Sequence, residues 1–183
     1  MARLPYLDEE DLAGDDKDIV KRGMNLHRIL AHSPEAARRY SGLARYMRFD
    51  SDLDPRLREM AILQVGYLAE SPYDYSHHLR LGREIGVTDD DVKAIEDETA
   101  GNDSGLPDLD RAVLRGAREM SVGMNLNDAT FETLRAHLGE SDIVDLVMTI
   151  AFYNGAVRLL GALQIDVEPA FQPELDAHPF SKE

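Results

Sequence analysis

The chain has 183 residues, with 20 lysines and arginines against 35 aspartates and glutamates, which gives a formal net charge of −15. It contains no cysteine, and this excludes disulfides, thiolate metal ligands, cysteine nucleophiles and thiol-based peroxide chemistry. The acidic balance repels nucleic acid and anionic membrane surfaces. We therefore expect a small-molecule substrate, no nucleic-acid partner and no membrane partner.

The beginning of the chain, MARLPYLDEEDLAGDD, lacks the basic and then apolar order of a signal peptide, and no uninterrupted apolar run reaches bilayer-spanning length. This predicts a cytoplasmic protein. The composition predicts a single domain over residues 1–183, with an acidic lead-in at 1–17 and a proline-rich arm at 166–183. Because prolines oppose helix, we expect the arm to be extended over the surface or onto a neighbouring subunit.

Helical periodicity of the apolar residues dominates, and alternating runs typical of strands are absent. The pattern predicts an all-α bundle of about eight helices. We place them at 18–31, 34–48, 54–69, 72–84, 88–98, 106–122, 127–138 and 141–164. Ser33, Ser71 and Thr88 each precede a predicted helix with carboxylates in its first turn, as capping residues do, and Gly86 fits a helix stop.

The stretch SPYDYSHH, residues 71–78, opens one of these helices and has two interpretations. Ser71 and Asp74 have the spacing of a capping box, which is a structural role. Asp74 and His78 are also four residues apart, so helical geometry makes them neighbours on one face. The sequence leaves open whether His78 is a core histidine or a reactive group, because it lies on the apolar stripe of its helix.

Metal binding has little support in the sequence. The adjacent residues His77 and His78 point about 100° apart on a helix, so they do not readily chelate one ion together. No HExxH motif or second histidine at chelating spacing occurs. We expect no metal and no cofactor.

Two further polar positions lie within apolar helices. Glu59 is close to the buried face of its predicted helix, where a carboxylate needs a partner, and either a nearby arginine (Arg56 or Arg58) or a histidine could supply one. Asn154 and Arg158 share a face of the most apolar helix. Arg158 could pair with a protein carboxylate, lie at a subunit interface or bind a substrate carboxylate.

The ordered set Arg56, Glu59, Tyr73, Asp74, His78 and Gly86, within RLREMAILQVGYLAESPYDYSHHLRLGREIGV, resembles the carboxymuconolactone decarboxylase family of the alkylhydroperoxidase D superfamily. The resemblance extends through NLHRILAHSP and LVMTIAFYNGAVRLLGAL, so it covers most of the chain. It implies an alkylhydroperoxidase D-like helical fold that assembles into trimers or hexamers.

In the alkylhydroperoxidase D branch, a Cys-x-x-Cys-x-x-x-His motif works with an upstream glutamate as a proton relay. The resemblance places those cysteines on Ser71 and Asp74, whereas Glu59 and His78 match the relay. Serine and aspartate cannot replace the thiolates of a disulfide-cycling peroxidase. The decarboxylase branch, which acts on a carboxylated unsaturated lactone without a recognised metal or organic cofactor, is therefore the expected relative.

This resemblance implies a lyase in which His78 donates or shuttles a proton and Glu59 orients it. Tyr73 and Tyr75 are candidate hydroxyl donors to the lactone oxygen. The candidate substrate-binding residues are Arg56, Asp74, His77, Asn154 and Arg158. The alternative is a cysteine-free relative that keeps the fold as a binding or structural module without turnover; a closed site around His78 favours the module and a ligand-sized cavity favours the enzyme.

Overall fold

The computed structural model describes residues 1–180, and these residues form helices and connecting turns without a β-strand. The all-α prediction is therefore confirmed. The helices are α1 (Asn25–Leu30), α2 (Pro34–Arg45), α3 (Pro55–Leu68), α4 (Pro72–Glu84), α5 (Asp89–Thr99), α6 (Asp108–Val122), α7 (Asp128–His137), α8 (Glu140–Leu163) and α9 (Gln172–Ala177). Short 3-10 turns at Glu9–Asp11, Gly14–Ile19 and Pro169–Phe171, and a π-turn at Tyr46–Asp50, complete the structure.

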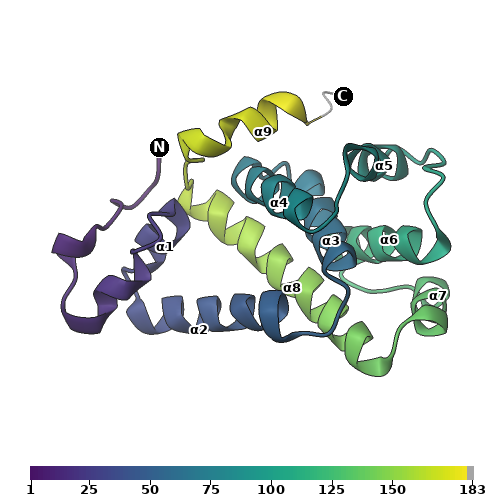
Figure 1. The fold of residues 1–183 in the computed structure, drawn as a ribbon, viewed down its shortest axis with the longest axis horizontal. Coiled ribbons are helices and arrows are strands. Elements are labelled where there is room, and N and C mark those ends of the chain that lie inside the picture. Colours follow the sequence, from purple (N-terminus) through teal and green to yellow (C-terminus); the bar gives the residue numbers. More distant parts are fainter. Residues whose placement is uncertain (181–183) are drawn as a thin grey trace.

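Helix α8 crosses the middle of the molecule (Figure 1). Helices α1 and α2 and the N-terminal turns lie on one side of it, and α5, α6 and α7 lie on the other. Helix α3 packs against α4, α6 and α8, and its residues from Leu57 to Gly66 are all buried. A helix buried on every side needs no amphipathic pattern, which explains why apolar residues occupy most positions of α3.

By length and composition α8 could also cross a bilayer. In this fold its residues Leu146, Ile150 and Val157 pack into a core formed with α3 and α6. The apolar character of α8 is therefore used inside the helical fold, as it is in the core helix of a water-soluble protein.

Local chemistry explains most of the helix boundaries. Thr88 and Asp91 form the reciprocal capping box at the start of α5, and Gly86 has a positive φ of 98° after α4. Ser71, by contrast, makes no side-chain capping hydrogen bond. Ser71 therefore occupies the predicted N-cap position of α4, as Ser33 does before α2, but neither side chain makes the expected hydrogen bond; Pro72 lies in the first turn of α4.

Two predicted segments differ from the structure. The helix expected over 18–31 is interrupted at Gly23, whose φ of 66° ends the preceding turn before α1 begins. The arm is not extended: it turns at Pro169–Phe171 and forms α9, which packs on α4. Ion pairs from Arg80 and Arg83 to Glu174 supply the contacts that fix it there. Residues 181–183 of the predicted arm lie outside the described residues.

Candidate active site

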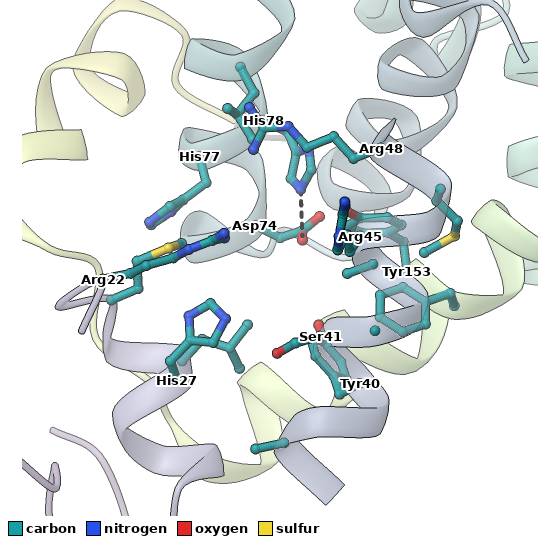
Figure 2. A pocket seen from close by; sticks show the side chains of 18 of the residues that line it. Arg22, His27, Tyr40, Ser41, Arg45, Arg48, Asp74, His77, His78 and Tyr153 are labelled. Atoms are coloured by element: carbon teal, nitrogen blue, oxygen red, sulfur yellow. Dashed lines mark ion pairs between the residues drawn. The ribbon is translucent and has the colours of Figure 1, made fainter. Parts of the chain in front are cut away.

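A cavity of about 610 Å³ opens between α2, α4, α8 and the N-terminal segment (Figure 2). Side chains from α3 reach its wall, and α1 contributes the side opposite α4. This volume is typical of small-molecule sites. A ligand-sized space therefore lies beside His78. Such a space is expected of an enzyme, whereas a module without turnover is expected to have a closed site around His78.

Glu59 and His78 meet in the wall of this cavity. His78 Nδ1 lies 2.6 Å from Glu59 Oε2, and the two residues are 8% and 3% exposed. The guanidinium of Arg58 donates to the other oxygen, Glu59 Oε1, from Nε and Nη2, each at 3.2 Å. Arg58 in turn donates to the carbonyls of Met47 and Arg48. The sequence left an arginine and a histidine open as partners of Glu59, and the structure supplies both.

Burial opposes charge on both members of this pair, but their mutual attraction prevails. Burial raises the pKa of Glu59, whereas His78 and Arg58 lower it and leave it below its usual range. Burial lowers the pKa of His78, but Glu59 and Asp74 outweigh this effect and leave it raised. Both shifts favour the charged forms of the pair, carboxylate and imidazolium, beside a ligand-sized space.

Asp74 lies one helical turn before His78 and also lines the cavity (Figure 2). Its Oδ1 lies 3.9 Å from His78 Nε2, and its buried Oδ2 has no hydrogen-bond partner among the described residues. Burial raises the pKa of Asp74 to about 6. Asp74 is therefore part of the site, and the interpretation of this residue as only a helix cap is not supported by its geometry.

The predicted tyrosines are not the ones whose hydroxyls are free in the cavity. Tyr73 lines it, but its hydroxyl accepts a hydrogen bond from the backbone N–H of Leu26 and donates one to Glu168 Oε1. Tyr75 points into the core against Tyr67, away from the cavity. These contacts do not support Tyr73 and Tyr75 as hydroxyl donors to a ligand.

Tyr40 of α2 and Tyr153 of α8 line the cavity instead (Figure 2). The ring of Tyr153 meets that of His78 edge-on, with centroids 4.8 Å apart. Neither hydroxyl makes a hydrogen bond within the described part of the chain. Burial raises the pKa of both groups, so both remain neutral hydroxyls that can donate. The tertiary arrangement that places α2 and α8 around the cavity brings them here, and no local motif signals it.

Three predicted substrate-binding residues lie outside the cavity. Arg56 pairs with Asp91 and Asp110 and so joins α3 to α5 and α6. Arg158 is exposed and donates to the side chain of Asn154, whose amide donates to Ser121 Oγ. These contacts are structural, and we do not retain the three residues as ligands of a substrate.

Other arginines surround the cavity. Arg22 follows the N-terminal turns, and Arg45 and Arg48 lie at the end of α2 and in the π-turn after it (Figure 2). Arg22 and Arg48 form no ion pair with the described residues, and Arg45 is 3.9 Å from its nearest carboxylate, Asp50. In a chain with a net charge of −15, uncommitted cations at one cavity indicate a site for an anion.

His77 lines the cavity beside His78 but contacts the C-terminal arm. Its Nδ1 donates to the carbonyl of Tyr73 at 2.7 Å, and its Nε2 lies 3.1 Å from Glu168 Oε2 without good hydrogen-bond alignment. The ring is stacked between Tyr73 and Phe171. His77 therefore anchors the arm to α4, and its contribution to the cavity is mainly one of shape.

His27, on the α1 side, was not predicted as a site residue. Figure 2 shows its ring facing the cavity, and its buried Nδ1 has no hydrogen-bond partner among residues 1–180. Burial and the charge of Arg22 lower its pKa, so it is neutral near pH 7. A neutral imidazole can exchange a hydrogen bond with an uncharged group of a ligand. Among residues 1–180, no cluster of three histidine or acidic residues forms a metal site.

The comparisons with known proteins agree with this fold. The sequence model of the Carboxymuconolactone decarboxylase family matches residues 34–117, which include Glu59, Asp74 and His78. No curated protein matches the chain. A solved structure of an uncharacterised peroxidase-related protein with an alkylhydroperoxidase AhpD core, from Ralstonia eutropha JMP134, is 21% identical, with a TM-score of 0.76 over 93% of this chain and 94% of that chain.

Two further structures share the fold at 18% identity. A peroxidase-related protein from Silicibacter sp. TM1040 has a TM-score of 0.74 over 93% of each chain. The debrominase Bmp8, solved with 2,3,4-tribromopyrrole as a cysteine-to-alanine variant, has a TM-score of 0.77 over 97% of this chain and 99% of its own. At these identities the likeness establishes the AhpD-like fold. Residues 34–117 thus resemble the carboxymuconolactone decarboxylase family in sequence, and the chain contains no cysteine.

Proposed function

We propose that the protein is a cofactor-independent lyase that removes CO₂ from a small, unsaturated, carboxylated lactone or a closely related compound. The observation that carries this proposal is the buried Glu59–His78 pair, which opens onto a cavity with uncommitted arginines around it. The first feature supplies protons, and the second attracts a carboxylate. The match of residues 34–117 to the carboxymuconolactone decarboxylase family supports the same reaction class.

The reaction needs little beyond these groups. Loss of CO₂ leaves an electron pair that delocalises through the conjugated double bond onto the lactone carbonyl oxygen. The hydroxyls of Tyr40 and Tyr153 are free to donate to that oxygen. A proton from the His78 side of the cavity then completes the product, and solvent restores the proton. The net change is substrate carboxylate plus one proton to decarboxylated lactone plus CO₂.

The arginines have a separate role in this proposal. Arg22, Arg45 and Arg48 bind the substrate carboxylate and orient the ring. A carboxylate held in this way must leave water, and the ion pair that it forms with a guanidinium offsets that cost. Arginine therefore contributes chiefly to substrate binding, whereas His78 and the tyrosines contribute to the chemical step.

The debrominase complex supports a small ring compound as the ligand of this cavity, but it does not support thiol chemistry in this chain. It shows that a protein of this fold binds a small unsaturated ring. The structure described here has a cavity of about 610 Å³ for a ligand of that kind. A reaction that requires a cysteine cannot be transferred to this chain, because the chain has none.

The test is to incubate the purified protein with carboxymuconolactone and related carboxylated lactones, and to follow CO₂ release and the loss of ultraviolet absorbance. The His78→Ala variant should lose turnover by 100-fold or more. His137→Ala, at an exposed histidine in the last turn of α7, should turn over as the wild type does. Wild-type protein that binds these lactones without releasing CO₂ would instead identify a binding module.

A further inference from the structure

The side chain of Asp74 is the most unusual polar group in the cavity. It is 5% exposed, and its Oδ2 has no hydrogen-bond partner among the described residues. An unpaired buried carboxylate is costly, so such a group tends to hold a proton or to meet a ligand. None of the contacts that fix the fold explains why a carboxyl group is placed here.

Helix α3 leaves space for this carboxyl group at Gly66. A Cβ at position 66 would lie 3.1 Å from Asp74 Oδ2 and 3.5 Å from the backbone of Tyr75. Glycine in the interior of a helix is less stable than alanine by roughly 1 kcal/mol. The absence of a side chain at position 66 therefore gives Asp74 a place in the wall at a cost to helix stability.

His78 is poorly placed to reach a ligand directly. Its Nδ1 is held by Glu59 at 2.6 Å, and its Nε2 faces Asp74 Oδ1 at 3.9 Å. Tyr153 packs edge-on against its ring. Both nitrogens therefore face carboxyl groups of the protein. The carboxyl group of Asp74, a residue that lines the same cavity, is the next group along this chain of polar groups.

We propose that the Asp74 carboxyl is the catalytic acid that transfers a proton to the ligand, and that Glu59 and His78 act through it as positioning residues. The inference rests on the proposed function and assigns the donor within it. After CO₂ leaves, the O–H bond of Asp74 breaks and a C–H bond forms at the ligand carbon. His78 then returns a proton to Asp74 and regains its own from solvent.

The groups around Asp74 favour this role. The pKa of Asp74 is raised to about 6, because burial and the charge of Glu59 raise it by more than the charges of His78 and His77 lower it. A carboxyl in this range can both hold and release a proton near neutral pH. The other titratable groups near it come from α2 and α8, and they are Tyr40 and Tyr153.

Deuterium exchange tests the acid without requiring decarboxylation. The protein is incubated in D₂O with the decarboxylated unsaturated lactone, and incorporation at its acidic carbon is followed by proton NMR. Asp74→Asn should lower the exchange rate at least 100-fold, and Asp74→Glu should recover part of it. For CO₂ release, kcat/KM of the wild type should fall as pH rises above about 6, because the acid must be protonated. For exchange, in which the carboxylate first removes the C–H proton, kcat/KM should instead rise with pH through about 6. Both dependences should be absent from the residual activity of Asp74→Asn.

Asp145→Asn is the matched control, because Asp145 is a buried carboxylate that accepts hydrogen bonds from Tyr46 and Ser51 outside the cavity. It should exchange deuterium as the wild type does. Thermal unfolding should show Asp74→Asn to be at least as stable as the wild type, since the substitution removes an unpaired buried acid.

The outcomes separate this inference from the proposed function. Exchange without CO₂ release in the wild type would overturn the lyase and leave Asp74 as the acid. CO₂ release with exchange that is unchanged in Asp74→Asn, but lost in His78→Gln, would overturn the role of Asp74 and keep the lyase. A wild-type protein that exchanges no deuterium would also overturn the assignment of Asp74.

Discussion

Glu59 and His78 form a buried pair in which Glu59 Oε2 lies 2.6 Å from His78 Nδ1. The carboxylate is also held by Arg58 through its other oxygen. Two cations therefore share one carboxylate, and only one of them, His78, can lose its proton in the physiological range. The charge of this pair consequently depends on pH through His78.

Glu59→Gln should lower the pKa of His78, because the charge of Glu59 helps to keep that pKa raised. The pKa can be followed from the ring protons of His78 by NMR, with His78→Gln identifying the resonance. Turnover should fall by about 100-fold, since the imidazole is no longer charged or oriented. An unchanged His78 titration would contradict the pairing.

The same pair predicts how stability depends on pH. The pKa of His78 is raised in the folded state, so its contribution is complete below the unfolded value of about 6.5 and is lost as pH rises through the folded value. The pKa of Glu59 is lowered, so its contribution is present above about 4.3 and is lost as pH falls through the folded value. The stability difference between wild type and Glu59→Gln, measured by urea unfolding, should therefore be largest between about pH 4.5 and 6.5.

The two tyrosine positions offer a direct contrast. Tyr153→Phe keeps the edge-on ring contact with His78 but removes a hydroxyl from the cavity, so kcat should fall roughly 10-fold to 100-fold while KM changes little. Tyr75→Phe removes a buried hydroxyl that has no hydrogen-bond partner in the described part of the chain. Tyr75 lies in the core, outside the cavity. That variant should keep full turnover and should be as stable as the wild type or slightly more so. Loss of activity in Tyr75→Phe but not in Tyr153→Phe would instead support Tyr75 as the hydroxyl donor, as the sequence predicts.

These tyrosines show how far the sequence alone could predict the site. Glu59, Asp74 and His78 come from two consecutive helices, and helical spacing together with family resemblance is enough to group them; the structure places all three in the wall of one cavity. Tyr40 and Tyr153 come from helices that are distant in sequence, and only the tertiary arrangement of α2 and α8 around the cavity brings them together. Spacing on one helix could not distinguish Tyr75, which faces the core, from a tyrosine that faces a ligand.

The fold was more accessible to prediction than the site. Apolar periodicity located the main helices, because burial of one face is a local property of the sequence. The exceptions occur where tertiary contacts prevail over local preference. The arm after residue 166 forms α9 despite its prolines, because Glu174 pairs with Arg80 and Arg83 of α4. The predicted helix at 18–31 is interrupted because Gly23 adopts a positive φ.

The arginines of the cavity should control substrate affinity. Arg22→Gln and Arg48→Gln should each raise KM roughly 10-fold with little change in kcat, since each removes about 1.4 kcal/mol of binding to the substrate carboxylate. Arg39→Gln changes the net charge equally, but its side chain is 86% exposed and does not line the cavity. It should leave KM unchanged. Equal effects of all three variants would indicate a response to overall charge instead of a specific site.

Gly66→Ala separates helix stability from activity at the Asp74 carboxyl. Alanine should favour α3 by up to roughly 1 kcal/mol through its helix propensity, but the added Cβ would crowd Asp74 Oδ2 at 3.1 Å. We expect turnover to fall several-fold because the carboxyl group must shift away from position 66 and so leave its place beside His78. Gly155→Ala is the matched control, since it lies within α8 and a Cβ there would meet no atom within 4 Å. The two variants should both keep or raise the melting temperature, and only Gly66→Ala should lose activity; equal activity in both would show that the position of Asp74 does not limit the reaction.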